Sequence, residues 1–188
     1  MRLFLAIPLS DAVRGAVAEM QARLRATGAG VRWVEPDNFH ITVKFIGDRP
    51  DELLPELEGV CGAVAAQTDA FEISVRGAGA FPKRGPLKTL WAGLSEGAEA
   101  WKALARRAEG PLAAYGVARE GGLVPHITLG RAKSPEGMDD LRAALDTEAR
   151  TDCGRQSADR IALVQSTLDP RGAIYKTLRE WPLLRKEP

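Results

Sequence analysis

One tetrapeptide pattern, histidine-isoleucine-threonine followed by an aliphatic residue, occurs twice in this chain, at residues 40–43 and 126–129. The two copies contain both histidines of the 188 residues. β-Branched residues dominate each copy, which favours strands. Alternation in a strand puts each histidine and the threonine two positions later on one face, about 7 Å apart. The pattern therefore predicts two equivalent strands, each with a polar face and a core face.

The sequence around these strands also repeats. The tripeptide Lys-Thr-Leu stands at 88–90, 48 residues after His40, and again at 176–178, 50 residues after His126. Each half then has the order strand, helix, strand, hairpin turn, strand. Because helices alternate with strands while hairpins make neighbouring strands antiparallel, we predict an α+β fold. Residues 1–188 are expected to form a single bilobal domain of two pseudo-symmetric lobes. Each lobe is a mostly antiparallel sheet with helices packed outside, and the active-site cleft lies between them.

Hydrophobic periodicity and turn residues predict the individual elements. The expected strands are residues 2–9, 31–35, 39–46, 71–78, 87–94, 123–130, 159–168 and 173–180. The expected helices are about 11–26, 51–67, 95–115 and 136–148. The segment between the fourth and fifth strands, residues 79–86, is expected to be a loop.

The charge balance limits the kinds of partner. With 26 Lys and Arg against 25 Asp and Glu, the net charge of +1 excludes a protein that binds nucleic acid through bulk positive charge, although a local basic cleft is compatible with it. The 45% hydrophobic content argues against disorder. A chain this long buries about two-thirds of its unfolded surface, so neither a disulfide nor a structural metal is needed for stability.

The cysteines and the hydropathy pattern predict a cytoplasmic protein. Cys61 and Cys153 are far apart and are expected to be reduced core thiols. No apolar stretch approaches the roughly 18–20 residues of a membrane span, and the N-terminus does not resemble a signal peptide. The two histidines and two cysteines show no chelating spacing, so no metal or other cofactor is expected.

The two polar faces suggest phosphoryl chemistry. If a twofold axis relates the lobes, His40, Thr42, His126 and Thr128 converge on one cleft. Imidazole titrates near pH 6.5, so one ring can accept a proton while the other donates one. Threonine hydroxyls can bind the oxygens of a phosphate as negative charge builds on them. The alternative is that both histidines are packing or surface residues and that duplication alone explains the repeat.

With its two His-Ile-Thr-aliphatic motifs, the sequence resembles the 2H phosphoesterase superfamily, which is defined by two His-x-Thr/Ser-x motifs. Within it the chain is similar to the RNA 2',3'-cyclic phosphodiesterase family, also called the LigT-like or 2'-5' RNA ligase family. The resemblance covers nearly the whole chain. The segments that carry it are 2–7, 32–34, 38–47, 79–82, 90–93 and 125–131.

The resemblance implies hydrolysis of a terminal RNA 2',3'-cyclic phosphate to a 2'-phosphate without a metal. It assigns His40 as the general acid for the 3'-oxygen, His126 as the general base toward water, and Thr42 and Thr128 as phosphate ligands. The pseudo-symmetry leaves the acid and base roles interchangeable on sequence alone. A 2'-5' RNA ligase acting on tRNA half-molecules is one alternative, and a non-catalytic nucleotide or RNA-end binding module is another.

The expected partners are RNA 3' ends with a 2',3'-cyclic phosphate, or small cyclic nucleotides. The internal repeat removes the need for a dimer to build the site, so we expect a monomer.

Two basic residues close to the motifs are further candidates. The family commonly has a phosphate-binding basic residue at the position of Arg131. Strict alternation puts Arg131 on the face away from His126, so a phosphate contact requires the strand to twist or end there. Lys44 falls on the face of His40, where it adds positive potential to the cleft or is a solvated edge lysine.

Three aromatic residues are candidates for stacking on a terminal base, Trp33, Phe45 and Phe81. Phe45 alternates with the aliphatic positions of its motif, so core packing is the favoured interpretation for it. Lys83 and Arg84 lie in a turn-rich basic segment that either contacts the RNA backbone or is an ordinary solvated hairpin tip.

Overall fold

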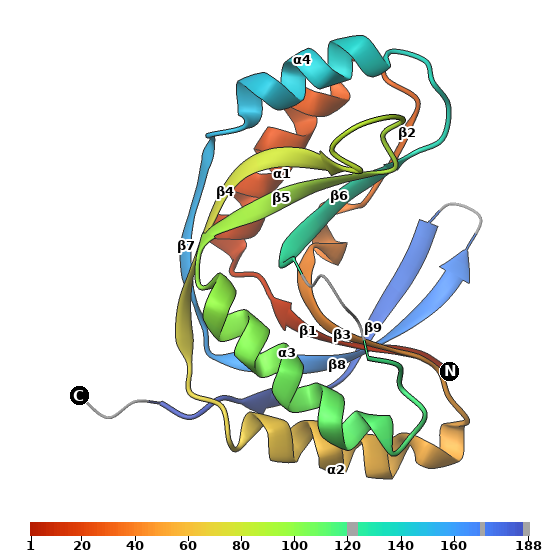
Figure 1. Cartoon of the computed structure of the whole chain (residues 1–188), viewed down its shortest axis with the longest axis vertical. Coiled ribbons are helices and arrows are strands. Elements are labelled where there is room, and N and C mark those ends of the chain that lie inside the picture. Colours follow the sequence, from red (N-terminus) through yellow and green to blue (C-terminus); the bar gives the residue numbers. More distant parts are fainter. Residues whose placement is uncertain (120–123, 170–171, 186–188) are drawn as a thin grey trace.

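The computed structural model describes residues 1–119, 124–169 and 172–185, and they contain nine strands and four α-helices (Figure 1). The strands are β1 (Arg2–Pro8), β2 (Val31–Trp33), β3 (His40–Asp48), β4 (Phe71–Phe81), β5 (Thr89–Glu96), β6 (His126–Ala132), β7 (Asp152–Ala158), β8 (Arg160–Asp169) and β9 (Gly172–Pro182). The helices are α1 (Asp11–Arg25), α2 (Leu54–Ala65), α3 (Ala98–Ala113) and α4 (Met138–Glu148), with single 3-10 turns η1 (Pro36–Asn38) and η2 (Asp51–Leu53). Residue 123, the first of a predicted strand, lies outside the described residues.

The strands form one curled sheet in the order β7-β4-β5-β6-β3-β1-β8-β9, and β2 also pairs with β6. Every ladder between these named strands is antiparallel. No helix in the described parts of the chain is long and apolar enough to cross a membrane.

The two motif strands lie at the centre of this sheet. β3 and β6 pair at Ile41 and Ile127, which are the same position of the two tetrapeptides. On one side β1, β8 and β9 continue from β3, and on the other β5, β4 and β7 continue from β6. We call these the β3 lobe and the β6 lobe. The pseudo-twofold axis therefore passes through the Ile41–Ile127 pair.

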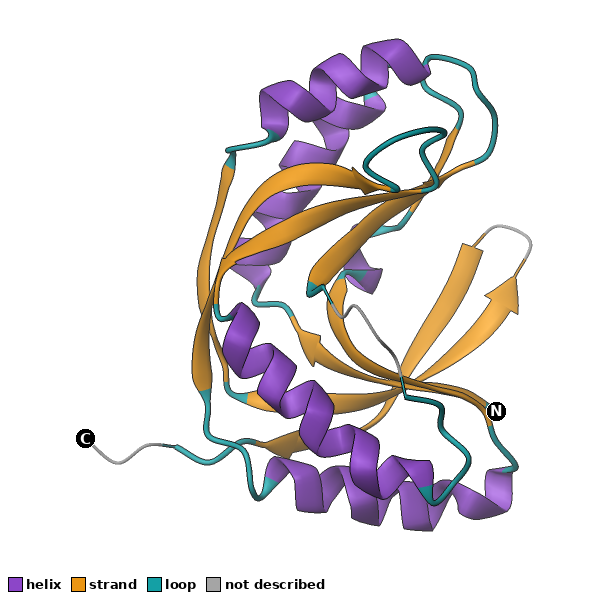
Figure 2. Ribbon diagram, viewed as in Figure 1, coloured by secondary structure: helices purple, strands orange, loops and turns teal. Residues whose placement is uncertain are grey.

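Two helices cover the outside of each lobe. α2 and α3 pack against the β3 lobe, whereas α1 and α4 pack against the β6 lobe, as the two ends of Figure 2 show. Burial of the apolar faces of these helices holds each half-sheet in place. The predicted α+β fold, with two pseudo-symmetric lobes and helices outside an antiparallel sheet, is confirmed.

The two lobes are not the two halves of the sequence. The β4–β5 hairpin follows the His40 motif but pairs with β6, whereas the β8–β9 hairpin follows the His126 motif but pairs with β1. The Lys-Thr-Leu copy at 88–90 runs into β5, beside β6, while the copy at 176–178 lies in β9, at the end of the strand order. Their predicted equivalence is wrong, because a three-residue match does not determine which neighbour a strand pairs with.

Two other predictions from the sequence differ from the structure. Strand β7 was not expected, because its residues are mainly polar and only Cys153 and Ala158 are buried. β4 continues to Phe81 and β5 begins at Thr89, so the connecting segment is residues 82–88 instead of the predicted 79–86. By contrast, α1 follows its predicted spacing, with the Ser10 hydroxyl accepting a hydrogen bond from the first turn at Val13 N.

A β-bulge interrupts the alternation of β3. Leu5 pairs with Lys44 and the next β1 residue, Ala6, pairs with Thr42, so Val43 is an extra residue on β3. A bulge of this kind turns two successive residues to the same face. Val43 and Lys44 are accordingly both buried.

Lys44 therefore does not face the cleft, and its predicted placement beside His40 is wrong. The side chain is fully buried on the helix side of the sheet, where its Nζ lies 3.2 Å from a carboxylate oxygen of Glu109 on α3. Because it has no exposed surface, it cannot touch RNA.

We predict that Lys44→Ala lowers the free energy of unfolding by about 3–5 kcal/mol, because it leaves the Glu109 carboxylate without its buried ammonium partner. The double change Lys44→Met with Glu109→Leu is expected to cost much less, since it removes both charges and keeps the volume. Urea unfolding of the three proteins measures this difference. Equal losses in the single and double variants would contradict the assignment.

Candidate active site

One solvent-open pocket of about 750 Å³ is lined by four of the five predicted catalytic and phosphate-binding residues, all but His126. We call it the site pocket. Its lining residues are Arg2, Phe4, Val34, Asn38, His40, Thr42, Phe45, Thr128, Arg131, Ser166, Ala173 and Tyr175.

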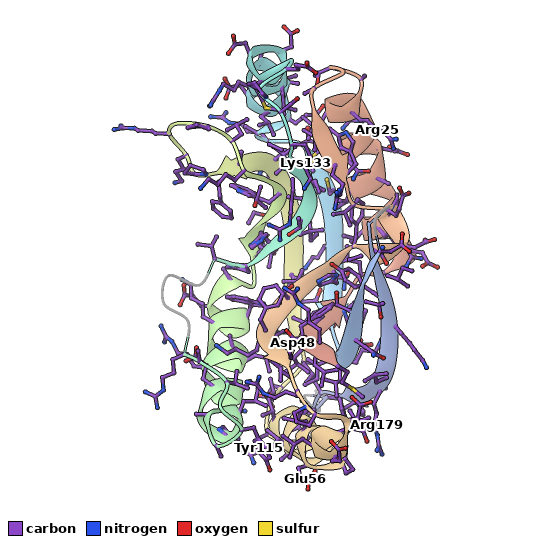
Figure 3. All side chains as sticks on the ribbon, turned by 90° about the vertical axis from the view of Figure 1, so that its right-hand side faces the viewer. Arg25, Asp48, Glu56, Tyr115, Lys133 and Arg179 are labelled. Atoms are coloured by element: carbon purple, nitrogen blue, oxygen red, sulfur yellow. The ribbon has the colours of Figure 1, made fainter. Side chains whose placement is uncertain are left out.

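The register between the motif strands explains this convergence. Because Ile41 pairs with Ile127 in antiparallel fashion, His40 lies opposite Thr128 and Thr42 lies opposite His126. His126 is beside the site pocket rather than in its lining. Figure 3 shows the opposite directions of the two strands, with Asp48 at the end of β3 and Lys133 just beyond the end of β6.

His40 is held in one orientation by its neighbours. Its Nδ1 lies 2.8 Å from the carbonyl oxygen of Asn38, and because a carbonyl only accepts, Nδ1 carries the hydrogen. Its Nε2 lies 3.1 Å from the hydroxyl of Thr42. The ring of Phe4 stacks on the imidazole at 4.7 Å, and Tyr175 meets it edge-on at 5.3 Å. Nε2 is therefore the nitrogen of His40 that is available for proton transfer.

His126 has the equivalent backbone bond. Its Nδ1–H donates to the carbonyl oxygen of Val124 at 2.8 Å, again two residues before the histidine. The ring of Phe81 meets the imidazole edge-on, with the two ring centroids 5.4 Å apart, and it packs against Trp91 at a centroid distance of 5.3 Å. This bond leaves Nε2 as the ring nitrogen of His126 that is available for proton transfer.

The surroundings lower the pKa of both histidines. For His40 the main cause is burial, with a smaller effect from the charge of His126, while the hydrogen bond to Asn38 acts in the opposite direction. For His126 burial is again the main cause, the bond to Val124 opposes it, and the charge of Arg131 adds to the lowering. Both rings therefore favour the neutral form at neutral pH, and a bound anion would raise both pKa values.

A second bulge brings Arg131 into the site pocket. Gly130 pairs with Leu90, and Thr128 pairs with the next β5 residue, so Leu129 is an extra residue on β6. Leu129 and Gly130 are both buried, and the alternation reverses after them. Arg131 thus returns to the face of His126, which plain alternation did not allow, and its Nη1 donates to the hydroxyl of Thr89 at 3.3 Å.

Phe45 reaches the site pocket through the equivalent bulge of β3. It is 49% exposed and lines the pocket with His40, so its favoured prediction as a core residue is wrong. The bulge at Val43 reversed the alternation, so that Phe45 lies on the same face as His40.

The other sequence-predicted contacts lie outside the site pocket. Trp33 pairs with Gly130 across β2 and β6, where a Cβ on that glycine would come within 3.1 Å of its ring, so it packs on the sheet. Phe81 contacts His126 instead of the pocket. Lys83 and Arg84 are exposed in the turn between β4 and β5.

Several residues of the site were missed by sequence reasoning. Arg2 and Phe4 alternate with the core residues of β1, a signal that was present, but Ser166 and Tyr175 reach the pocket only because β8 and β9 pair beside β1. The amide of Asn38 donates to the carbonyl of Ala173 at 3.2 Å and so ties the turn before His40 to β9.

A second hollow, of about 590 Å³, lies on the other side of His40. It shares Asn38, His40 and Tyr175 with the site pocket but contains neither motif threonine nor Arg131. The site pocket is therefore the candidate centre for chemistry. Within the described ranges, no three His, Cys, Asp or Glu residues stand together as metal ligands do.

Two imidazoles, two threonine hydroxyls and a guanidinium, brought together where two pseudo-symmetric lobes meet, define a phosphoesterase of the two-histidine class. A family model described as LigT like Phosphoesterase matches residues 7–91. The chain is 33% identical to the RNA 2',3'-cyclic phosphodiesterase of Methanothermobacter thermautotrophicus, over 97% of this chain and 99% of that one. It is 35% identical to the enzyme of the same name from Archaeoglobus fulgidus, over 95% and 98%. The chain belongs to the LigT-like phosphoesterase family.

Solved structures agree on the fold. A crystal structure of a Thermus thermophilus protein is similar over the whole of both chains, with a TM-score of 0.82 and 29% identity. Escherichia coli LigT in complex with 3'-AMP covers 97% of both chains, with a TM-score of 0.77 and 24% identity. The curled sheet and its helices are therefore the family's architecture.

We predict that both histidines titrate below the ordinary imidazole value of 6.5, because burial disfavours their charged forms. Proton NMR can follow both rings, since the chain has only two histidines and His126→Ala identifies the remaining signal. In that variant the pKa of His40 should rise, because a neighbouring positive charge is removed. A titration midpoint of His40 that is lower in His126→Ala than in the wild type would contradict the proximity of the two imidazole rings.

Proposed function

We propose that this protein hydrolyses RNA ends with a 2',3'-cyclic phosphate to a 2'-phosphate, without a metal. The observation that carries the proposal is the pairing of the two motif strands, which puts His40, Thr42 and Thr128 at one pocket with His126 beside it. The relatives named RNA 2',3'-cyclic phosphodiesterase, each more than 30% identical over nearly the full chain, support it.

The proton transfers follow from the two Nε2 atoms. The oxygen of a water molecule attacks phosphorus, and Nε2 of His126 accepts the proton that this oxygen loses. The bond between phosphorus and the 3'-oxygen breaks, and Nε2–H of His40 gives its proton to that oxygen. The bond to the 2'-oxygen is kept, so the product has a 2'-phosphate and a 3'-hydroxyl.

The hydroxyls and the arginine stabilise the charge that develops on phosphate. Thr42 and Thr128 lie across from the opposing histidines and can donate to the non-bridging oxygens. Arg131, from the β6 lobe, supplies a permanent positive charge in the same pocket.

The roles of the two histidines are part of the proposal. The base must be neutral before reaction, and the charge of Arg131 favours the neutral form of His126. The acid must be protonated, and the negative charge of a bound cyclic phosphate raises the pKa of His40 toward that state. Arg131 thus breaks the symmetry in the direction of His126 as base.

The location and assembly of the protein are also proposed. We infer a monomer, because the two lobes of one chain supply both histidines. We infer a cytoplasmic location, because Cys61 and Cys153 are both free, buried thiols.

His40→Ala and His126→Ala are each expected to lower kcat by about 10²–10⁴-fold, since each removes one general acid or base. The assay follows a nucleoside 2',3'-cyclic phosphate and separates 2'- from 3'-monophosphate products. Far-ultraviolet circular dichroism controls for folding. Near-normal activity in either variant would refute the mechanism.

The same assay tests the absence of a metal and the main alternative function. Activity should persist in EDTA, and a loss restored by a divalent cation would refute a metal-independent reaction. Accumulation of a 2'-5'-linked product from fragments with cyclic phosphate and 5'-hydroxyl ends would instead support the ligase alternative.

The pH dependence follows from the lowered pKa values. One histidine must be charged and the other neutral, so kcat/KM should pass through a maximum, and this maximum should lie below pH 6.5 because both pKa values are lowered in the free enzyme. The maximum of kcat should lie at higher pH, since the bound phosphate raises the pKa values. Rate profiles at saturating and limiting substrate measure both maxima. A kcat/KM that still increases above neutral pH would contradict this.

A further inference from the structure

Three side chains that the proposed mechanism does not use form a row across the β3 lobe. Arg2 of β1 pairs with Ser166 of β8, and Ser166 pairs with Tyr175 of β9. All three line the site pocket. Directly opposed residues on one face of an antiparallel sheet have Cβ atoms about 4.5–5.5 Å apart. A guanidinium, a hydroxyl and a phenol therefore stand side by side, and we call this set the Arg2 row.

Arg2 lies one step along β1 from the residue that stacks on His40. Phe4, which stacks on His40 at 4.7 Å, follows Arg2 by two residues on the same strand. Two residues of a strand advance about 7 Å. The Arg2 end of the row is thus separated from the His40 position by a length that a single nucleotide can span, whereas Tyr175, at the other end, meets the His40 ring edge-on at 5.3 Å.

The Arg2 row offers only hydrogen-bond donors and positive charge to a ligand anion. Arg2 is exposed, and its side chain makes no ion pair or hydrogen bond within the described ranges. Its register partner on β3 is Asp48, yet no ion pair joins the two side chains within 4 Å. Burial raises the pKa of Tyr175, which keeps its hydroxyl protonated, while the charges of Arg131 and Arg2 both act on it in the opposite direction. A guanidinium group from each lobe therefore lines the same pocket as this phenol.

We propose that the Arg2 row is a second anion subsite, which binds the phosphodiester on the 5' side of the RNA's terminal nucleotide. The inference rests on the proposed function and specifies its substrate class. In an RNA that ends in a 2',3'-cyclic phosphate, the next negative charge is the phosphate on the 5'-oxygen of the same ribose. With the cyclic phosphate between the motif residues, this second phosphate reaches Arg2, Ser166 and Tyr175. The enzyme is thereby selective for polynucleotide ends over cyclic nucleosides.

Three substrates test this selectivity. They are a nucleoside 2',3'-cyclic phosphate, the same compound with a 5'-phosphate, and a dinucleotide that ends in the cyclic phosphate. The wild-type kcat/KM should be about tenfold higher for the second and third, as one charge-assisted hydrogen bond predicts. Arg2→Gln should remove this advantage through KM and lower kcat/KM for the first substrate much less than for the other two. It should also reduce the slope of log KM against log salt for the dinucleotide by about 0.7.

Arg25→Gln is the matched control. Arg25, labelled in Figure 3, is an exposed arginine in the last turn of α1 and does not line the site pocket, so its substitution should leave all three substrates unaffected. An equal loss on all three substrates in Arg2→Gln would overturn the proposal, because Arg2 would then act on the reacting phosphate. A wild-type enzyme that turns over all three equally would overturn it as well.

A binding experiment separates this inference from the proposed function. Calorimetry compares a nucleoside 2'-phosphate with the corresponding 2',5'-bisphosphate, neither of which needs to react. Tighter binding of the bisphosphate in the wild type, lost in Arg2→Gln and kept in Arg25→Gln, supports the subsite even if no cyclic phosphate is hydrolysed. Equal binding of the two compounds overturns the subsite whatever the outcome of the activity assay.

Discussion

The antiparallel pairing of β3 with β6 at Ile41 and Ile127 is the contact on which the rest of the structure depends. It joins two half-sheets into one and lies on the pseudo-twofold axis. Because the paired residues are equivalent, each motif histidine falls opposite the other motif's threonine. A shift of one residue in this pairing would turn one polar face away from the other, and the site would not exist.

The two bulges turn this symmetric frame into an asymmetric site. The extra residues at Val43 and Leu129 bring the fifth position after each histidine to the pocket face, which is Phe45 in one lobe and Arg131 in the other. One strand thus contributes an apolar ring and the other a cation. Burial is the main cause of the lowered pKa of His126, and the charge of Arg131 adds to it and distinguishes His126 from His40, although each ring makes the equivalent backbone hydrogen bond.

Much of the fold could be predicted from the sequence, because most elements bury one clear face. The helices and the motif strands follow from apolar spacing and from β-branched runs. β7 could not be predicted, since it lies at the end of the strand order and most of its residues are polar. The sequence also could not predict that the β4–β5 hairpin joins the β6 lobe and the β8–β9 hairpin joins the β3 lobe. The residues of a strand show which face is buried but not which other strand it pairs with.

The sequence by itself determined the proposed catalytic set, because the only two histidines stand in one repeated pattern with a threonine two positions later. Strand periodicity was enough to put each pair on one face. Only the tertiary structure decided what surrounds that set. Lys44 is buried and Arg131 faces the pocket because bulges depend on strand pairing, and Arg2, Ser166 and Tyr175 meet there because three distant strands are neighbours. Local residue patterns cannot specify such contacts, since they form only when segments far apart in the chain pair in one register.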